Sequence, residues 1–560
     1  MIIEFCIFIS IINKTIMKKI FLTLIVISLI MISCTKEKVD LIIHNAKVYT
    51  VNNDFLIAES FAVRDGKFLE IGNSNDILKK YNSDQVIDLQ GKYVYPGLID
   101  AHCHFYGYCL SLLQADLRST KSFDEIVDII KEHDTKYNSE WVLGRSWDQN
   151  DWDIKEFPTK EKLDMAFPDK PVYLRRVDGH AAVVNSKALS LAGITSKTKI
   201  DGGKIILQNG QPTGVLIDNA MNLVEKFIPE VYTESVIKAL EQGEQNCFAA
   251  GLTSVGDAGL TKKEVLLIDS LQKNNKMHMR INAMLTPTDE TLDYFIKNGI
   301  YKTDYLNVRS IKLYADGALG SRGAALIEPY SDDPGNDGLI VEPIEVYHRI
   351  CKLAYENNYQ VCTHAIGDSA NRLILDIYAQ YLKGKNDRRW RIEHAQIVHP
   401  DDLHKFGDYS IVPSIQATHC TSDMYWTGQR LGEKRIKYAY TYKELLDQNG
   451  WIPNGTDFPV ERIEPLLTFY ASVARKDIEG YPENGFQIDN ALTREETLKS
   501  MTIWAAKTAF EENEKGSIEP TKLADFIVLE KDIMEIPESE ILSVKIIETY
   551  SSGTTTLNIK

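Results

Sequence analysis

The hydrophobic positions of this chain follow one pattern at its two ends and another across its middle. Near both ends, short apolar runs alternate with turn residues, in 41–49, 61–72 and 86–89 and again in 524–529 and 544–550. The run 61–72 is centred on Asp65-Gly66, a dipeptide typical of a β-hairpin turn. We therefore expect a small β-sandwich domain built from both chain ends, residues 39–91 with 516–560.

Across the middle, apolar strands alternate with segments of helical periodicity. Eight runs are candidate strands: 92–101, 252–256, 279–285, 308–314, 359–363, 389–393, 410–415 and 451–454. Helix-like segments such as 343–357 and 369–382 follow most of them. This alternation predicts an α/β fold, a (β/α)8 TIM barrel over residues 92–515. The first gap is too long for one helix, so we expect an inserted subdomain at 105–230, with a hairpin at Asn209-Gly210.

Length and charge limit the partners. A chain of 560 residues is long enough for two or more domains. Its formal net charge of -16 argues against nucleic acid, which needs a basic surface, and leaves a small-molecule substrate as the expected partner. The 8 cysteines include no Cys-x-x-Cys pair, so neither a disulfide framework nor a zinc ribbon is indicated.

The N-terminus has the pattern of an export signal. Met17-Lys18-Lys19 is basic, residues 20–32 are apolar, and a serine precedes Cys34. This resembles a bacterial lipoprotein signal over residues 1–34, with Cys34 as the lipidated residue and either Met1 or Met17 as the true start. It would tether the protein to a membrane in the bacterial cell envelope, facing the periplasm or the exterior. An uncleaved membrane anchor is the alternative.

The carboxyl ends of the barrel strands carry metal-binding side chains, and chemistry gathers at these ends in such barrels. Strand one ends in His102-Cys103-His104, and residues two apart on a strand share a face, so both imidazoles can bind one ion. Such a pair alone also suits solvated or hydrogen-bonded histidines. His364, His394 and Asp457 end strands five, six and eight. Imidazole and carboxylate ligands favour zinc over manganese, iron or nickel.

Strand four contributes a lysine. Lys312, Tyr314 and Asp316 share one face of it. A lysine inside a barrel is costly unless its charge is paired or removed, and an ion pair with Asp316 is one solution. An ammonium about 4 Å from a divalent ion is repelled by about 8 kcal/mol at an effective dielectric of about 20. Chemistry that converts the amine into an anion would reverse the sign of this interaction.

The order of these residues resembles the amidohydrolase superfamily, in the branch that includes N-substituted formamide deformylases. The likeness extends over nearly all of the mature chain. The segments that carry it are 95–104, 144–148, 178–180 with 185–189, 316–322, 364–368, 393–395, 457–459 and 516–525. Thr521 stands where the family usually has glycine, at a turn away from the chemistry.

The resemblance implies a metal centre and a reaction. Lys312, carbamylated by CO2, would bridge two divalent ions, one held by His102, His104 and Asp457 and the other by His364 and His394; some relatives use a single ion. The implied reaction is hydrolysis of carbon–nitrogen bonds other than peptide bonds, in amides or N-substituted formamides, by a metal-activated hydroxide. Relatives are often dimers, so a homodimer is also expected.

Asp457 and His180 are the candidate catalytic residues. Asp457 would move the proton from water to the leaving nitrogen. His180 follows a turn at Asp178-Gly179, where it either donates to the substrate carbonyl or organises the loop. The candidate substrate residues are Trp147, Asp148, Arg176, Asp178 and Arg322, the last facing either a substrate carboxylate or an acidic neighbour. We expect Cys103 and the other histidines (His44, His133, His278, His348, His399, His404 and His419) to be packing or surface residues.

Two other functions stay open. The same scaffold can hydrolyse esters or lactones or deaminate rings, although relatives that deaminate often lack the bridging lysine. A membrane-tethered binding lipoprotein without turnover is the non-enzyme alternative. The complete ligand set argues against the latter, because a degenerate site would tolerate the loss of a ligand.

Overall fold

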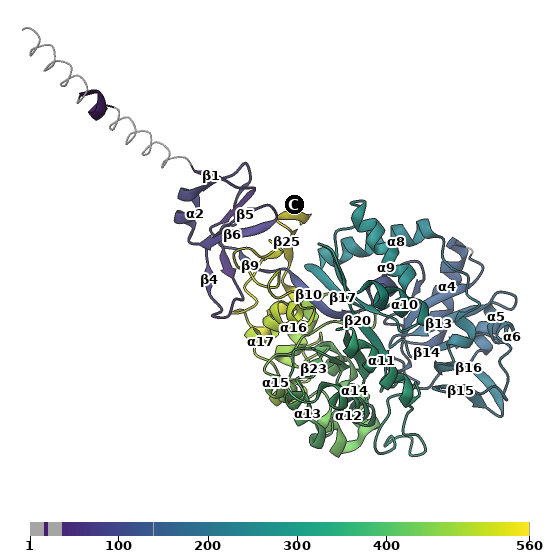
Figure 1. Cartoon of the computed structure of the whole chain (residues 1–560). Coiled ribbons are helices and arrows are strands. Elements are labelled where there is room, and N and C mark those ends of the chain that lie inside the picture. Colours follow the sequence, from purple (N-terminus) through teal and green to yellow (C-terminus); the bar gives the residue numbers. More distant parts are fainter. Residues whose placement is uncertain (1–15, 21–35, 138, 559–560) are drawn as a thin grey trace, which may run out of the picture.

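The computed structural model describes residues 16–20, 36–137 and 139–558 (Figure 1). The candidate lipidation residue Cys34 and most of the expected signal segment lie outside the described residues. Among the helices of the described ranges, none is long and apolar enough to span a bilayer.

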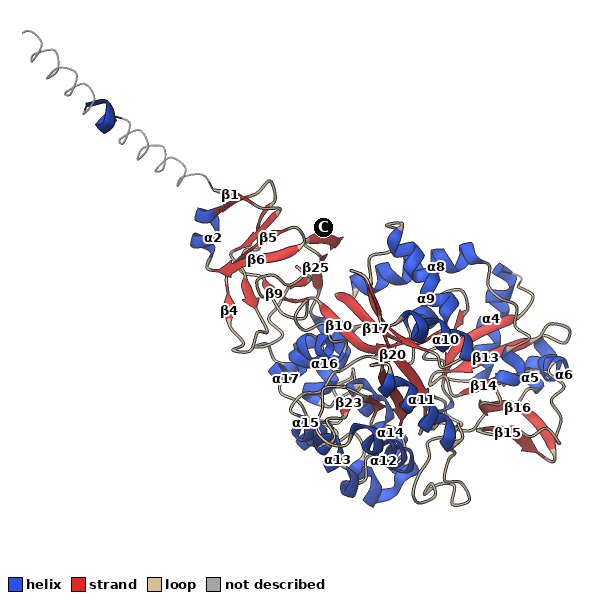
Figure 2. Ribbon diagram, viewed as in Figure 1, coloured by secondary structure: helices blue, strands red, loops and turns tan. Residues whose placement is uncertain are grey.

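The central body is a barrel of parallel strands surrounded by helices (Figures 1 and 2). In spatial order, its strands are β10 (Leu98–Cys103), β17 (Leu252–Leu260), β18 (Arg280–Leu285), β20 (Leu306–Tyr314), β21 (Gln360–Ala365), β22 (Arg391–His394) and β23 (Val412–Ser414). Each strand pairs in parallel with the next. The predicted α/β class and TIM-barrel architecture are confirmed.

The sequence predicted an eighth barrel strand at 451–454, but this segment is not a regular strand. We call it the bridged segment, because it is joined to its neighbour by one isolated bridge. Asn454 forms only an isolated parallel bridge with Ile415. The segment still reaches β10, because the Ala101 amide donates to the Asn454 carbonyl at 3.2 Å and the Asp457 amide donates to the His102 carbonyl at 2.9 Å. These few hydrogen bonds close the cylinder and fix Asp457 beside strand one.

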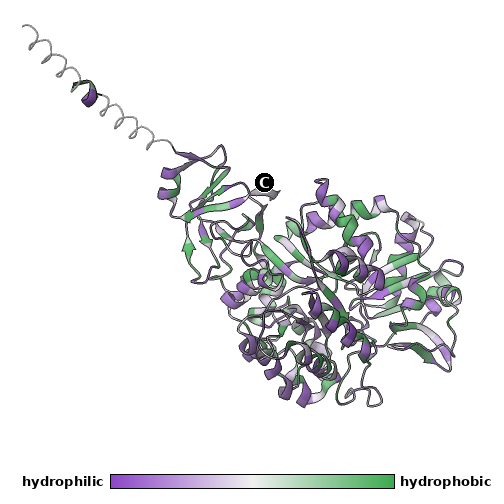
Figure 3. Ribbon diagram, in the orientation of Figure 1, coloured by the Kyte–Doolittle hydropathy of each residue, from purple (hydrophilic) through white to green (hydrophobic). Residues whose placement is uncertain are grey.

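Helices cover the outside of the barrel. They include α8 (Thr233–Ala249), α9 (Lys262–Lys273), α10 (Asp289–Asn298), α11 (Ile344–Glu356), α12 (Asp368–Leu382), α14 (Ala417–Arg435), α15 (Tyr442–Asn449), α16 (Pro465–Ala474), α17 (Arg494–Ser500) and α18 (Ile503–Thr508). The helices predicted at 343–357 and 369–382 are α11 and α12. Hydrophobic residues concentrate on the barrel strands, whereas the outer helices alternate hydrophilic and hydrophobic positions (Figure 3), as expected where one helix face packs on a core.

Strands from both chain ends combine in one β-rich lobe, coloured purple and yellow in Figure 1. One sheet has the order β6-β5-β2-β8 and the other β26-β25-β24-β9-β3-β4. The strands are β2 (Leu41–His44), β3 (Lys47–Tyr49), β4 (Ile57–Ala58), β5 (Ser60–Arg64), β6 (Lys67–Gly72), β8 (Val86–Asp88), β9 (Tyr93–Pro96), β24 (Phe526–Leu529), β25 (Ile546–Ser551) and β26 (Thr554–Asn558). The C-terminal strands therefore pair directly with strands that precede the barrel.

The run 92–101, predicted as one barrel strand, is two strands in different sheets. β9 pairs with β24 and β3 in the lobe, and the barrel strand β10 begins at Leu98. Gly97 lies between them, where an added Cβ would be 2.4 Å from Oγ1 of Thr253. The chain therefore crosses between sheets where only glycine fits. Hydrophobicity alone did not reveal this change, because both strands are buried.

The insertion forms a six-stranded mixed sheet beside the barrel. Its order is β11 (Ala115–Asp116), β12 (Val142–Trp147), β13 (Val172–Arg176), β14 (Ala181–Val184), β16 (Gln211–Asp218) and β15 (Gly203–Gln208). The hairpin predicted at Asn209-Gly210 joins β15 and β16. The Asn219 side chain donates to the Val341 carbonyl at 3.0 Å, which ties the sheet to the barrel loops.

Candidate metal centre and active site

The predicted ligands from strands one, five, six and eight meet at the barrel mouth. The His394 ring centroid lies 5.1 Å from that of His102 and 4.6 Å from that of His364. Oδ1 of Asp457 is 3.5 Å from Nε2 of His102 and 3.3 Å from Nε2 of His104. One ligand atom each from His102, His394 and Asp457 lies within 4.8 Å of the others, a spacing that can hold a cation.

Several buried polar atoms at this mouth have no hydrogen-bond partner within the described part of the chain. They are Nε2 of His102, Nδ1 of His394, Oδ1 of Asp457 and Nζ of Lys312. Each unsatisfied buried group costs about 1–3 kcal/mol, so four together in one place are unusual for a purely structural cluster. Imidazole nitrogen and carboxylate oxygen are donors that bind divalent cations. The residues present therefore fit a divalent metal.

His102 is oriented by a buried ion pair. Its Nδ1 donates to Oε2 of Glu393 at 2.6 Å, and Nε of Arg391 lies 2.6 Å from Oε1 of the same carboxylate. This contact leaves Nε2 of His102 as the lone-pair nitrogen directed at Asp457. Burial alone would raise the pKa of Glu393, but Arg391 and His102 hold it well below its usual range.

The surroundings of the other imidazoles also favour the neutral form. Nδ1 of His104 donates to the Ala258 carbonyl at 3.0 Å, which leaves Nε2 free to accept. Burial lowers the pKa of His364 and of His394 well below the usual value for histidine, and for His394 it outweighs the opposing effect of Asp457. Metal binding requires neutral imidazole, so this environment favours the ligand form.

Lys312 does not form the ion pair with Asp316 that the sequence left open. Instead, the Asp316 carboxylate accepts backbone N–H bonds from Ala325, Ile366 and Gly367 at 2.9, 3.0 and 2.8 Å. Lys312 is fully buried, and its Nζ lies 4.7 Å from the Tyr314 ring centroid. Burial lowers the pKa of Lys312 to about 8, so the neutral amine is accessible near physiological pH.

Two of the ligands have strained backbones. His394 has φ 73° and Asp457 has φ 62°, in the left-handed region that side chains other than glycine rarely adopt. Such conformations cost about 1–3 kcal/mol and concentrate at functional sites. Here they occur where the chain leaves β22 and where it leaves the bridged segment, at the mouth of the barrel.

His419, expected to be a surface or packing residue, belongs to the site. Its Nε2 lies 3.3 Å from Oδ2 of Asp457, and its Nδ1 lies 3.0 Å from Oε1 of Glu461. Burial alone would lower the pKa of His419, but the two carboxylates raise it well above the usual value. The signal was its position shortly after strand seven, a strand end that the sequence analysis did not examine.

Three of the five predicted substrate residues lie together with His180 beside the candidate metal ligands. Asp148, Arg176, Asp178 and His180 line a cavity of about 250 Å³, which His104, His364, His394 and Asp457 also line. Arg176 forms ion pairs with Asp148 and, at 2.5 Å, with Asp178. Nδ1 of His180 lies 2.7 Å from Oδ1 of Asp218. Burial alone would lower the pKa of His180, but Asp218 raises it, so the ring favours the donor form.

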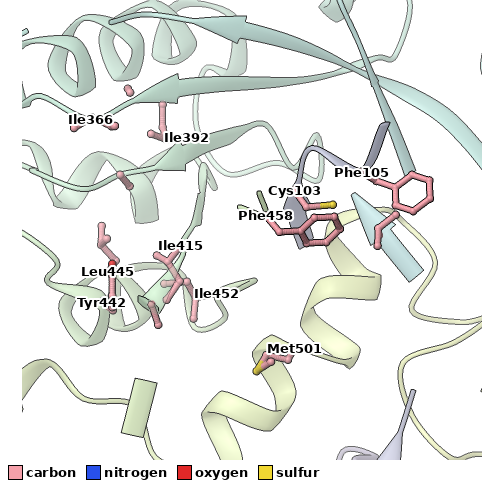
Figure 4. Packing of buried hydrophobic residues seen from close by; sticks show 14 of the residues in the cluster. Cys103, Phe105, Ile366, Ile392, Ile415, Tyr442, Leu445, Ile452, Phe458 and Met501 are labelled. Carbon is pink, nitrogen blue, oxygen red and sulfur yellow. The ribbon is translucent and has the colours of Figure 1, made fainter. Parts of the chain in front are cut away.

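Arg322 and Trp147 lie away from this cavity. Nη2 of Arg322 lies 2.9 Å from Oδ2 of Asp332. Arg322 therefore pairs with an acidic neighbour, which is one of the two alternatives that the sequence left open. Trp147 is buried in the core of the insertion, and its Nε1 donates to the Leu174 carbonyl at 2.8 Å. Trp147 directly precedes the cavity residue Asp148, but the alternation of β12 turns its side chain to the other face. Cys103 packs in the barrel core beside Phe458 (Figure 4), in agreement with its expected packing role.

Fold and site together define a TIM-barrel protein with a candidate site for divalent metal, and comparison with known proteins identifies its family. Residues 85–557 match the sequence profile of the amidohydrolase family, and the chain belongs to this family. It is therefore a hydrolase of the amidohydrolase family with a site for divalent metal.

Relatives match along most of their length. Protein LONG AFTER FAR-RED 3 of Arabidopsis thaliana is 34% identical over 535 residues, which cover 92% of this chain and 91% of that protein. The N-substituted formamide deformylase of Arthrobacter pascens is 26% identical over 539 residues, covering 92% of this chain and 97% of that one. The crystal structure of an uncharacterized metal-dependent hydrolase from Pyrococcus horikoshii OT3 aligns with a TM-score of 0.73 at 28% identity, covering 90% of this chain and 99% of that chain.

Proposed function

We propose that this protein is a zinc-dependent hydrolase of carbon–nitrogen bonds other than peptide bonds, acting on amides or N-substituted formamides. The observation that carries the proposal is a group of buried polar atoms on the predicted ligands, Nζ of Lys312 among them, that have no hydrogen-bond partner among the described residues. The full-length similarity to an N-substituted formamide deformylase supports the formamide class.

In this proposal His102, His104 and Asp457 would hold one divalent ion, His364 and His394 would hold a second, and a carbamate on Lys312 would be a ligand that they share. The neutral amine of Lys312 would add to CO2 and release one proton, which converts the neutral side chain into an anionic carbamate. Nζ of Lys312 is buried and has no hydrogen-bond partner in the described ranges, which supports this step, because an ammonium there would be repelled by the ions. A bound divalent cation supplies Lewis acidity toward a carbonyl oxygen and lowers the pKa of water.

The side chains around the centre would move and hold the proton. Asp457 would accept a proton from the attacking water at Oδ1 and deliver it to the leaving nitrogen. His419 would hold Oδ2, 3.3 Å away, and so orient the carboxylate. His180, kept in the donor form by Asp218, would donate a hydrogen bond to the substrate carbonyl.

Two matched compounds test the reaction. N-formyl-2-phenylethylamine and 2-phenylethyl formate differ only in the atom that leaves, nitrogen or oxygen. We expect purified protein with added zinc to hydrolyse the formamide, and the activity to disappear after chelation. Hydrolysis of the ester alone would favour the esterase alternative. Binding of metal without turnover of either compound, or of an amide, ester, lactone and aminopurine panel, would favour a binding protein.

The predicted export signal supports a location for this activity. We propose that Cys34 carries a lipid that tethers the enzyme to a membrane of the bacterial cell envelope, with the barrel outside the cytoplasm.

A further inference from the structure

A second cavity adjoins the metal centre. Its volume is about 450 Å³, and it shares His104, Asp178, His180, Tyr314 and Val460 with the first cavity. Strands β12 and β13 of the insertion form one wall, and barrel loops form the other. A substrate bound at the metal ligands can therefore extend into this space.

Two arginines lie side by side in that wall. Arg145 and Arg175 are direct register partners on the parallel strands β12 and β13, so their side chains leave the sheet on the same face. Both line the second cavity. Nε and Nη2 of Arg175 donate to the Gly179 carbonyl at 3.1 and 3.0 Å, and its Nη1 is 3.7 Å from Glu225.

Arg145 has no such partners. Within the part of the chain that the structure describes, its guanidinium makes no hydrogen bond or ion pair, and its Nε is buried. Burial and the neighbouring charge of Arg175 lower the pKa of Arg145 to about 9. An unpaired, partly buried cation beside a like charge is destabilising, and a bound anion would offset both effects.

The carboxylates that line the cavity do not serve this purpose, because each has another partner or is solvated. Asp178 pairs with Arg176, and Asp218 pairs with His180. Hydrogen bonds from the Tyr173 hydroxyl, the Tyr106 amide and three backbone amides go to Glu225, Asp257 and Asp316, respectively. Glu264 caps α9, and Glu342 is exposed. Their combined negative charge also disfavours a dianion such as phosphate. A monoanionic carboxylate matches the planar forks of the two guanidinium groups.

We infer that Arg145 and Arg175 form a carboxylate-binding subsite, and that the substrate is an amide or formamide with a carboxylate on the part that enters the second cavity. The reaction rests on the proposed function, whereas binding of a carboxylate by Arg145 does not. The subsite would place the acid group beside His180 and the metal ligands and so fix the direction in which the substrate enters.

Binding measurements test the subsite without turnover. The probes are 3-phenylpropanoate and the neutral 3-phenylpropanamide, with affinity measured by calorimetry on the purified full-length protein and its metal content determined in parallel. We expect the carboxylate to bind more tightly than the amide, and the variant Arg145→Gln to weaken carboxylate binding by about 10-fold or more with unchanged metal content. Arg349→Gln, a change at an exposed ion pair on α11, is the matched control and should bind like wild type.

Three results would overturn the subsite. The first is equal affinity for acid and amide in the wild-type protein. The second is unchanged carboxylate affinity in Arg145→Gln, which would place the anion on the metal instead. The third is loss of affinity in Arg322→Gln, which would place the anion at Arg322. If Arg145→Gln does not fold, the same comparison is made with Arg175→Gln, for which the same outcomes apply.

Hydrolysis separates this inference from the proposed function. N-formylphenylalanine and N-formyl-2-phenylethylamine differ only by a carboxylate. We expect kcat/KM of the wild type to favour the acid, and Arg145→Gln to remove that preference while sparing the neutral compound. If both are hydrolysed equally, the reaction stands and the subsite fails. If neither is hydrolysed but Arg145-dependent binding is measured, the subsite stands and the proposed reaction fails.

Discussion

At the scale of single residues, Asp457 is the side chain on which the proposed chemistry depends most. Asp457→Asn keeps the size of the side chain but removes its charge and its basicity. We expect turnover to fall by about 10²–10⁴-fold, the range typical of general acid–base groups, with the circular dichroism spectrum unchanged. Asp402→Asn, a buried carboxylate paired with Arg372 away from the barrel mouth, is the control and should retain full turnover. Wild-type turnover in Asp457→Asn would refute the assignment.

The hydrogen bonds of Asp532 lead us to predict that the free energy of unfolding depends on pH. Its carboxylate accepts bonds from Tyr95 at 2.9 Å, from Tyr49 at 2.9 Å and from Lys47 at 2.7 Å. Burial alone would raise the pKa of Asp532, but these donors lower it. The folded pKa is then below the unfolded value of about 3.9, so the stabilisation is complete above that pH and is lost as pH falls through the folded pKa. Asp532→Asn should lower the melting temperature at pH 7, with the difference shrinking near pH 3. An equal difference at both pH values would contradict this.

The candidate metal ligands could be selected from the sequence, but the residues that contact them could not. Each ligand follows an apolar run, so its position at a strand end could be read from the sequence. The roles of His419 and Arg145 depend on their neighbours Asp457 and Arg175. These neighbours are distant in sequence, so no local sequence pattern predicts the contacts. Trp147 was placed in the pocket because it adjoins Asp148, although adjacent residues on a strand point to opposite faces.

At the scale of elements, Gly455 determines how the bridged eighth segment meets β10. An added Cβ there would lie 2.5 Å from Oδ1 of Asp100 and 2.6 Å from the backbone N and O of His102. Gly455→Ala should therefore push the segment away from β10 and separate His102 from Asp457. We expect bound metal and melting temperature both to fall, with a stability loss of about 1–3 kcal/mol, as for other overpacked positions.

Gly72 offers the matched control for that substitution, because an added Cβ there meets nothing within 4 Å. Gly72→Ala should leave metal content and melting temperature near wild type. Unchanged metal binding in Gly455→Ala would show that the closing segment tolerates displacement.

The elements were predictable where hydrophobic periodicity and hydrogen bonding agree. Seven of the expected barrel strands overlap strands of the parallel sheet, because these apolar runs also pair with their neighbours. The run at 451–454 was predicted as a strand, yet it forms one bridge, since Pro453 has no backbone N–H to donate. The change of sheet at Gly97 depends on its contact with Thr253, which lies on another strand.

At the scale of the whole molecule, the N-terminal segment predicts where the enzyme resides. Cys34→Ser should shift the protein from the membrane fraction to the soluble fraction of a bacterial host, because acylation at that residue would be lost. The measurement is fractionation with immunodetection, and Cys109→Ser, a buried barrel cysteine, is the control. Retention of Cys34→Ser in the membrane would support the uncleaved anchor instead.

We expect bound metal to stabilise the whole barrel and the unmodified amine of Lys312 to destabilise it. A ligand at 1,000 times its Kd stabilises a fold by about 4 kcal/mol, so chelation should lower the melting temperature and zinc should restore it. In the chelated protein at pH 7, the lowered pKa of Lys312, about 8 against an ordinary 10.5, corresponds to a penalty of about 3 kcal/mol. The unfolded chain binds the extra proton between these pKa values, so this penalty fades as pH rises from 8 to 10.5.

Lys312→Met keeps the length of the side chain and removes the amine, so it separates the two effects. We expect this variant to be more stable than wild type in chelator at pH 7, with the difference disappearing near pH 10. With zinc and bicarbonate the order should reverse, because only the wild type can form the bridging carbamate and bind metal fully. Thermal melts under these four conditions, with metal content measured alongside, provide the test. A variant that is less stable than wild type in chelator would show that Lys312 is a structural residue, and the carbamate proposal would then lose its physical basis.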